Sequence, residues 1–250
     1  MLKVLSSFII VLSFISTIPV PQRFLPEWNS SSLRYFPLML PVTGLIFSAL
    51  WLISWQILSI IPEMSSILRG FMMMLFTLTL TGGLHLDGLM DTCDAVFSHR
   101  DRDTRLKILS DTHSGSFAVI GCTVILIAKT LLFSELLKIS IINLTFLLIP
   151  VYSRLGMSII LTNLPFAKSD GLAVMLGSSR HKSDNIFFAL MFIILIFLDV
   201  SAALIFILCL FIHVLRCLKI FGGITGDLLG AFVEISEVIM LFGTVIKFCI

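Results

Sequence analysis

Three aspartates, Asp87, Asp91 and Asp94, lie in the stretch GGLHLDGLMDTCD (82–94), soon after the apolar run FMMMLF (71–76). At about 100° per residue, their i, i+4, i+7 spacing places all three on one stripe of a helix. Like charges at this spacing repel, and a nearby membrane boundary makes the repulsion costlier. No Lys or Arg between 82 and 97 neutralises them. The stripe therefore predicts a site for a hard divalent cation, and Mg²⁺ is the expected one. The alternative is a helix end whose aspartates only face water.

The residues around this stripe are candidates for substrate binding. Gly82 and Gly83 precede it and can break the helix. His85 lies about 160° around a regular helix from Asp87, which favours a packed or hydrogen-bonded histidine on another face. A break at the glycines would change the direction of His85, so all three residues stay among the candidates.

A second cluster of polar residues occupies GGITGDLLGAFVEISE (222–237). Gly222, Gly223 and Gly226 precede a predicted helix and leave bare backbone N–H groups at its positive end, where a phosphate can bind. Asp227 and Glu234 are seven residues apart in an apolar run and so share one helical face. The glycine turn and the acidic helix face together predict the second half of a metal-assisted phosphoryl-transfer site.

Charged residues in two other places are further candidates. The segment 97–115 mixes acids and bases, and its cations Arg100, Arg102, Arg105 and Lys107 either face solvent or contact substrate phosphates. Asp111, which follows them, is a further candidate for substrate binding. Arg154 lies within an apolar helix, where an ionised side chain needs a partner. We expect that partner to be an acidic residue or a substrate phosphate.

The composition predicts that the elements holding these residues cross a membrane. Of the 250 residues, 58% are hydrophobic and 13% are charged, against about 45–50% and about 25% in soluble domains. A bilayer core needs about 20 apolar residues per helix, so this chain can form six to eight spans within a single domain, 1–250. The net charge of only +2 indicates no nucleic-acid partner.

Apolar runs separated by polar residues, Gly or Pro predict an all-α, polytopic bundle of about eight membrane helices. Within 186–218, Asp199 interrupts some thirty apolar residues. A single helix of that length would exceed the hydrocarbon thickness, so we expect two helices there. The predicted helices lie near 3–20, 36–61, 67–92, 116–134, 139–161, 184–198, 200–218 and 228–249.

The basic residues gather in four segments that eight spans would place on one side of the membrane: 21–35, 91–116, 162–185 and 216–230. These segments contain 11 of the 17 Lys and Arg residues. The positive-inside rule makes this side cytoplasmic, which predicts a multi-pass inner-membrane protein with the acidic clusters facing the cytoplasm. Both termini would then lie outside the cell.

The motifs TGGLHLDGLMDTCD (81–94) and GGITGDLLGAFVEISEV (222–238), with FISTIPVP (14–21) and YFPLMLPVTGLIF (35–47), closely resemble the cobalamin synthase family of adenosylcobinamide-GDP ribazoletransferases. The resemblance covers nearly the whole chain in the family's order. It implies a membrane enzyme that uses Mg²⁺ and joins adenosylcobinamide-GDP to α-ribazole, or to its 5′-phosphate, with release of GMP. The product is adenosylcobalamin or its phosphate, at a late step of cobalamin biosynthesis.

The resemblance also assigns residues. By position, Asp87, Asp91 and Asp94 match one acidic motif, whereas Gly222, Gly223, Thr225, Gly226, Asp227 and Glu234 match the second. The chain departs from the family pattern in three places: Ala95 replaces a common Gly, Asp111-Thr112-His113 replaces Asp-Ser-Arg, and Gly171-Leu172-Ala173 replaces Gly-Leu-Gly.

Two other classes of protein share some of these features. A CDP-alcohol phosphatidyltransferase also sets aspartates over a metal, but its pattern continues into G-x-x-A-R, and here Asp94 is followed by Ala95-Val96-Phe97. A cation-coupled transporter would have acids near the midplane of two related halves, and no such repeat is present. Besides these substrates and the lipid bilayer, a homo-oligomeric partner remains an open alternative.

Overall fold

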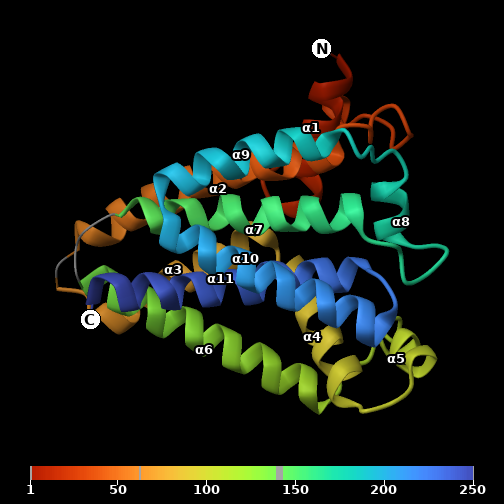
Figure 1. The fold of residues 1–250 in the computed structure, drawn as a ribbon. Coiled ribbons are helices and arrows are strands. Elements are labelled where there is room, and N and C mark those ends of the chain that lie inside the picture. The colour runs from red at the N-terminus through yellow and green to blue at the C-terminus, as the bar shows by residue number, and fades with distance from the viewer. Residues whose placement is uncertain (1, 62, 139–142, 250) are drawn as a thin grey trace.

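The computed structural model describes residues 2–61, 63–138 and 143–249, and the regular elements of the described chain are helices joined by loops (Figure 1). Within these ranges, extended pairing is limited to one isolated parallel bridge between Phe166 and Ile224. The predicted all-α class is confirmed. The helices are α1 (Leu2–Ile15), η1 (Gln22–Phe24), α2 (Phe36–Ser59), α3 (Ser66–Thr81), α4 (Leu84–Phe97), α5 (Arg102–Ile108), α6 (Ser116–Lys138), α7 (Leu144–Asn163), α8 (Leu172–Gly177), α9 (Asp184–Leu198), α10 (Val200–Arg216), η2 (Cys217–Phe221, a π-helical turn) and α11 (Gly226–Cys249).

Five of the described helices are long and apolar enough to cross a membrane, namely α2, α6, α7, α10 with its π-helical extension, and α11. The bent pair α3 and α4 gives a sixth if it is counted as one span. Helices α1 and α9 are apolar, but their 14 and 15 residues reach only about 21–23 Å, short of a hydrocarbon core of about 30 Å. The chain is a multi-pass membrane bundle. Among the described residues five or six helices are long enough to span the bilayer, so the predicted count of eight is not confirmed.

The predicted helix 67–92 is wrong, because it is two helices that meet at an angle of 92°. Gly82 and Gly83 lie between them with φ angles of +61° and +76°, in the left-handed region that glycine enters without steric cost. Gly82 is the C-cap of α3, and Gly83 is the N-cap of α4. The acidic stripe is therefore carried by its own helix, which turns sideways from the bundle.

The predicted break within 186–218 is confirmed at Asp199, between α9 and α10. The Asp199 carboxylate accepts hydrogen bonds from the Ala202 backbone N–H at 3.2 Å and from the Ser201 hydroxyl at 2.6 Å. Lys247, near the end of α11, forms an ion pair with the same carboxylate at 2.8 Å. Asp199 thus starts α10 and ties the C-terminal end of α11 to this turn.

The first helix does not cross the bundle. In Figure 1 the N-terminus lies near the loop that leads to α2, whereas the C-terminus lies at the far end of the bundle. The Ser7 hydroxyl donates to the Ser32 carbonyl in that loop, and the Thr17 N–H donates to the Leu80 carbonyl at 2.9 Å, where α3 ends. The prediction that both termini lie outside the cell is not tested by this arrangement and stays a prediction.

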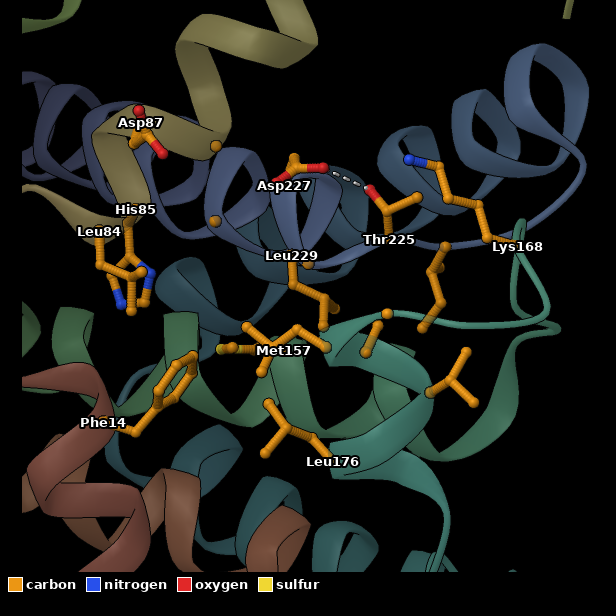
Figure 2. A pocket seen from close by; sticks show the side chains of 18 of the residues that line it. Phe14, Leu84, His85, Asp87, Met157, Lys168, Leu176, Thr225, Asp227 and Leu229 are labelled. Carbon is orange, nitrogen blue, oxygen red and sulfur yellow. Dashed lines mark hydrogen bonds between the residues drawn. The ribbon is translucent and has the colours of Figure 1, made fainter. Parts of the chain in front are cut away.

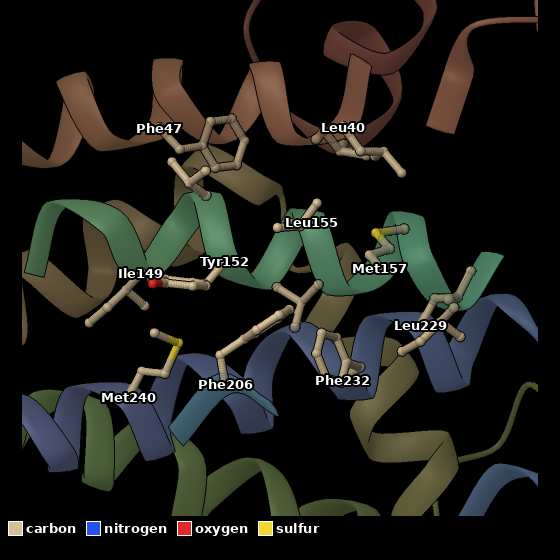
Figure 3. Packing of buried hydrophobic residues seen from close by; sticks show 14 of the residues in the cluster. Leu40, Phe47, Ile149, Tyr152, Leu155, Met157, Phe206, Leu229, Phe232 and Met240 are labelled. Carbon is tan, nitrogen blue, oxygen red and sulfur yellow. The ribbon is translucent and has the colours of Figure 1, made fainter. Parts of the chain in front are cut away.

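The core forms around α7, whose residues are buried along almost its whole length. Figure 3 shows α7 between α2, which contributes Leu40 and Phe47, and a layer that contains Phe206, Phe232 and Met240. Glycines allow the closest approaches. A Cβ on Gly44 of α2 would lie 2.7 Å from a carbonyl of α7. This packing holds α11 in a fixed position relative to the rest of the bundle.

Candidate active site

Helices α4 and α11 come together through one glycine on each. A Cβ on Gly88 would lie 2.7 Å from the Asp227 carbonyl oxygen, and one on Gly230 would lie 3.1 Å from the His85 Cα. Both distances are below ordinary van der Waals contact, so only glycine permits this approach. The two acidic motifs, about 140 residues apart in sequence, therefore converge as predicted. Sequence reasoning did not single out Gly88 and Gly230, although both lie within the quoted motifs.

Two carboxylates lie at this contact. Asp87 and Asp227 each stand in the first turn of their helix, where the positive end of the helix dipole favours negative charge. Asp91, one turn further along α4, is close enough to Asp87 and Asp227 to be repelled by both. In the described part of the chain, no Lys, Arg or His forms an ion pair with any of the three. Negative charge is therefore concentrated where α4 meets α11.

A cavity of about 170 Å³ opens beside Asp87 and Asp227 (Figure 2), and Asp91 is not among its lining residues. Thr225, Gly226 and Asp170 also line it. Lys168 extends toward Thr225, close enough to attract the charge of Asp227. Phe14, Met157 and Leu176 lie across the cavity from Asp227 and Thr225 in Figure 2. Leu172 lies against the start of α11, because a Cβ on Gly226 would be 3.9 Å from its Cδ2.

The glycine turn before α11 has two separate roles. Gly222 adopts φ +71°, and a Cβ on Gly223 would lie 2.5 Å from the Pro165 carbonyl, so both are needed to build the turn. Thr225 and Gly226 instead line the cavity. The Thr225 hydroxyl donates to the Asp227 carboxylate at 3.2 Å and accepts from the Leu228 N–H at 3.4 Å. Of the predicted phosphate-binding residues here, Thr225 and Gly226 face the cavity.

Arg102 and Lys168 connect this turn to its surroundings. Arg102 of α5 donates from Nε to the Phe221 carbonyl at 2.7 Å and from Nη2 to the Ala167 carbonyl at 3.3 Å. Lys168 donates to the Ser110 hydroxyl. Their contacts join the 97–115 segment, the 164–171 loop and the turn. Arg102 was one of the cations predicted to face solvent or contact substrate phosphates, and here it binds backbone carbonyls. Lys168 was not a candidate, and its place in a predicted one-sided basic loop was its only signal in the sequence.

Asp94 has a structural partner. Its carboxylate accepts from the Gly115 N–H at 2.5 Å and from the Ala118 N–H at 2.9 Å, and so caps the N-terminus of α6. Asp94 and Asp111 line a separate open hollow of about 390 Å³. Hydrogen bonds from the His113 side chain and backbone hold the pKa of Asp111 below its usual range.

The predicted arginines of the central segment are not part of the cavity. Arg100 lies in the exposed loop before α5, and Arg105 lies on α5; neither lines the cavity. Gly82 and Gly83 are also outside its lining, and their observed role is the bend between α3 and α4.

Glu234 lies two turns deeper along α11 than Asp227, at a buried ion-pair network. Lys129 of α6 pairs with Glu234 at 2.7 Å and with Glu237 at 2.8 Å. Glu237 also pairs with Arg154 of α7, whose guanidinium lies 4.6 Å from the centre of the Phe47 ring. The two positive and two negative charges balance. The partner of Arg154 is thus an acidic residue, Glu237, which was one of the two predicted alternatives. The Glu234 carboxylate pairs with Lys129, so this geometry gives no support to Glu234 as a metal ligand beside Asp227.

His85 is buried in the wall between the cavity and this network, with an exposed fraction of 1%. Figure 2 shows its imidazole on the side of Phe14 and Met157, away from Asp87, as the helical spacing predicted. Within the described residues, its Nε2 has no hydrogen-bond partner.

The fold and this cavity define a multi-pass helical membrane protein in which carboxylates and a lysine line one cavity. The model of the cobalamin-5-phosphate synthase family matches residues 7–245. Adenosylcobinamide-GDP ribazoletransferases of Desulfitobacterium hafniense and Lachnoclostridium phytofermentans are each 30% identical to the chain. The matches cover 94% of both chains for the first, and 97% of this chain and 98% of the relative for the second.

The chain belongs to the cobalamin-5-phosphate synthase family, and it is a transferase of cobalamin synthesis. A relative from a Geobacillus species, also 30% identical over 92% of this chain, has the same name as the first two. No solved structure matches the chain.

Proposed function

We propose that the protein transfers adenosylcobinamide phosphate from adenosylcobinamide-GDP to α-ribazole or α-ribazole 5′-phosphate, in a Mg²⁺-dependent reaction that releases GMP. The single observation that supports this most is the approach of Asp87 and Asp227 at the Gly88–Asp227 contact, beside a cavity and one helical turn from Asp91. The name shared by the relatives supplies the substrates. The family match favours this reaction over a CDP-alcohol phosphotransferase or a transporter.

The donor atoms at this site suit Mg²⁺. Within the described residues, no group of three His, Cys, Asp or Glu side chains is already arranged around a metal position. Mg²⁺ does not require one, because it commonly binds through one or two carboxylates, several waters and substrate phosphate oxygens. Asp87, Asp91 and Asp227 would hold it, since the Asp94 and Glu234 carboxylates already have other partners. When bound, Mg²⁺ would neutralise charge on the diphosphate.

The reaction joins the ribose hydroxyl oxygen of the acceptor to the phosphorus nearest cobinamide. The bond from that phosphorus to the oxygen bridging to GMP breaks, GMP leaves, and the hydroxyl proton is lost. Such a transfer depends mainly on positioning and charge neutralisation. Lys168 supplies a positive charge at the cavity, and Thr225 with Gly226 offers backbone N–H groups at the start of α11.

The test is GMP release by purified protein supplied with adenosylcobinamide-GDP and α-ribazole 5′-phosphate, with and without Mg²⁺. We expect release that needs all three components and stops on chelation. The proposal fails if the purified protein binds both substrates and releases no GMP, or if it works equally well in EDTA.

We also propose that the cavity opens toward the cytoplasm from the inner membrane, since the basic loops lie at its end of the bundle. Ser114, in the exposed loop before α6, provides a position for testing this. In a background without the native cysteines, Ser114→Cys should react with an impermeant maleimide in inverted vesicles and not in intact spheroplasts. The opposite pattern would reverse the orientation.

A further inference from the structure

The loop before α8 and the turn before α11 are joined next to the cavity. The Ala167 N–H donates to the Ile224 carbonyl, and the Ile224 N–H donates to the Pro165 carbonyl, both at 2.9 Å. Lys168 directly follows the paired residue of the loop, and Thr225 directly follows the paired residue of the turn. Both line the cavity, with Lys168 extending toward Thr225 (Figure 2). The position of the Lys168 charge relative to the start of α11 therefore depends on a pairing of only two hydrogen bonds.

One arginine from a third segment holds both sides of this pairing. Arg102, the first residue of α5, donates from Nε to the Phe221 carbonyl at 2.7 Å and from Nη2 to the Ala167 carbonyl at 3.3 Å. A guanidinium is planar and presents its donors in a fixed fork, so it bridges two carbonyls only at a set separation. Because it is charged, its bonds to carbonyl oxygens are stronger than bonds between neutral groups. Arg102 therefore fastens the loop to the turn.

The residues at both ends of this contact are fitted to it. Gly222 adopts φ +71°, and a Cβ there would lie 2.8 Å from the Arg102 Nε, so a larger residue would displace the guanidinium. At the start of α5, the Asp101 carboxylate accepts from the Thr104 N–H at 3.0 Å and from the Thr104 hydroxyl at 2.8 Å. This cap fixes the backbone from which Arg102 extends.

We propose that Arg102 is a positioning residue for the donor's diphosphate: it keeps the Lys168 charge in register with the N–H groups at the start of α11. Arg102 does not line the cavity, so it acts through the two segments that it joins and not by touching substrate. This rests on the proposed function and adds to it a residue from outside the cavity. Misplacing a group that positions substrate by about 1 Å can cost about a hundredfold in rate, so a loosened loop would matter.

The first test separates positioning from charge, because Arg102 also adds a positive charge near a phosphate site. Arg102→Lys keeps the charge, but a single ammonium group cannot reproduce the planar fork. We expect the variant to bind adenosylcobinamide-GDP about three- to tenfold more weakly than wild type, measured by equilibrium dialysis with Mg²⁺ and without acceptor. The matched control is Arg216→Lys, at the exposed end of α10 and outside the cavity lining, which should leave the affinity unchanged. Wild-type affinity in Arg102→Lys would overturn the proposal.

A double-mutant cycle tests what Arg102 positions. Lys168→Met removes the charge proposed to contact the diphosphate and should weaken donor binding about tenfold. If Arg102 acts by placing Lys168, adding Arg102→Lys to Lys168→Met should weaken binding by no more than about a further twofold. Independent sites add in free energy, so effects that multiply fully in the double variant would overturn the positioning role.

Hydrogen exchange tests the structural step without any substrate. The Ala167 and Ile224 amides form the pairing, so in Arg102→Lys the peptides that contain them should exchange at least about tenfold faster than in wild type. Peptides from α7 should exchange at the wild-type rate, which shows that the core is intact. Unchanged exchange at both amides would mean that Arg102 does not hold the two segments together, and the proposal would fail.

These measurements are separate from the proposed reaction because none of them requires turnover. If Arg102→Lys loosens the pairing and the cycle is non-additive, but wild-type protein releases no GMP when it holds both substrates, the proposed reaction fails and the positioning role stands. If GMP is released while the two substitutions act independently, the positioning role fails and the reaction stands.

Discussion

Glu237→Gln should destabilise the protein more than any comparable change of a surface charge. Glu237 pairs with both Lys129 and Arg154 inside the bundle, and all three side chains are no more than 5% exposed. The substitution keeps the shape and removes the charge, so two cations remain with Glu234 as their only nearby anion. Breaking a buried pair from one side costs about 3–5 kcal/mol. At about 2–4 °C per kcal/mol, the Tm should fall by about 6–20 °C.

The assay is thermal unfolding of detergent-solubilised protein, followed by the fluorescence of its tryptophans. The matched control is Glu135→Gln, which removes one partner of the exposed Glu135–Lys138 pair and should cost at most about 1 kcal/mol. The double variant Glu237→Met with Arg154→Met should be more stable than Glu237→Gln, because it removes a charge of each sign. If Glu237→Gln unfolds at the temperature of Glu135→Gln, the buried network does not stabilise the bundle.

Three further results are expected. Asp87→Asn and Asp227→Asn should each lower kcat at least about a hundredfold and leave the Tm within about 2 °C, since neither carboxylate forms an ion pair in the described chain. Near-normal turnover in either variant would remove that residue from the site. Gly88→Ala should lower activity, and it should lower stability by about 1–3 kcal/mol, because its Cβ would lie 2.7 Å from the Asp227 carbonyl. Gly230→Ala should lose less stability, because its Cβ would lie 3.1 Å from the His85 Cα. An unchanged Tm for Gly88→Ala would mean that α4 and α11 are farther apart. Asp94→Ala should lose about 1 kcal/mol of stability and Asp94→Asn less than half of that, since an amide oxygen still caps α6. Equal losses of Tm in the two variants, together with a raised Mg²⁺ requirement, would favour metal binding by Asp94.

The sequence predicted the features that depend on local spacing. The i, i+4, i+7 spacing of Asp87, Asp91 and Asp94 placed them on one helix, and the polar interruption at Asp199 located the break between α9 and α10. The membrane class followed from composition. The convergence of Asp87 with Asp227 was predicted because two acidic helix faces and a glycine turn suit one metal-assisted phosphoryl-transfer site. The family resemblance supported the same prediction.

The features that depend on depth and tertiary partners were not predictable in this way. Spacing shows that Asp227 and Glu234 share a face, but it does not show that Lys129 approaches the deeper one from α6. The run 67–92 is apolar on both sides of Gly82, so hydropathy alone does not reveal a left-handed break. For α1, a long apolar run predicted a crossing, whereas Thr17 turns the chain back by bonding to the end of α3.

The sideways turn at Gly82 and Gly83 has a consequence for the surrounding lipid. Because α3 ends after 16 residues, about 24 Å of rise, the acidic helix begins below the level that a full crossing would reach. Charged side chains there need water, and local thinning of the bilayer over them would let water reach them. Turnover should therefore vary with acyl-chain length, being highest in short-chain lipids and falling as longer chains close over the opening.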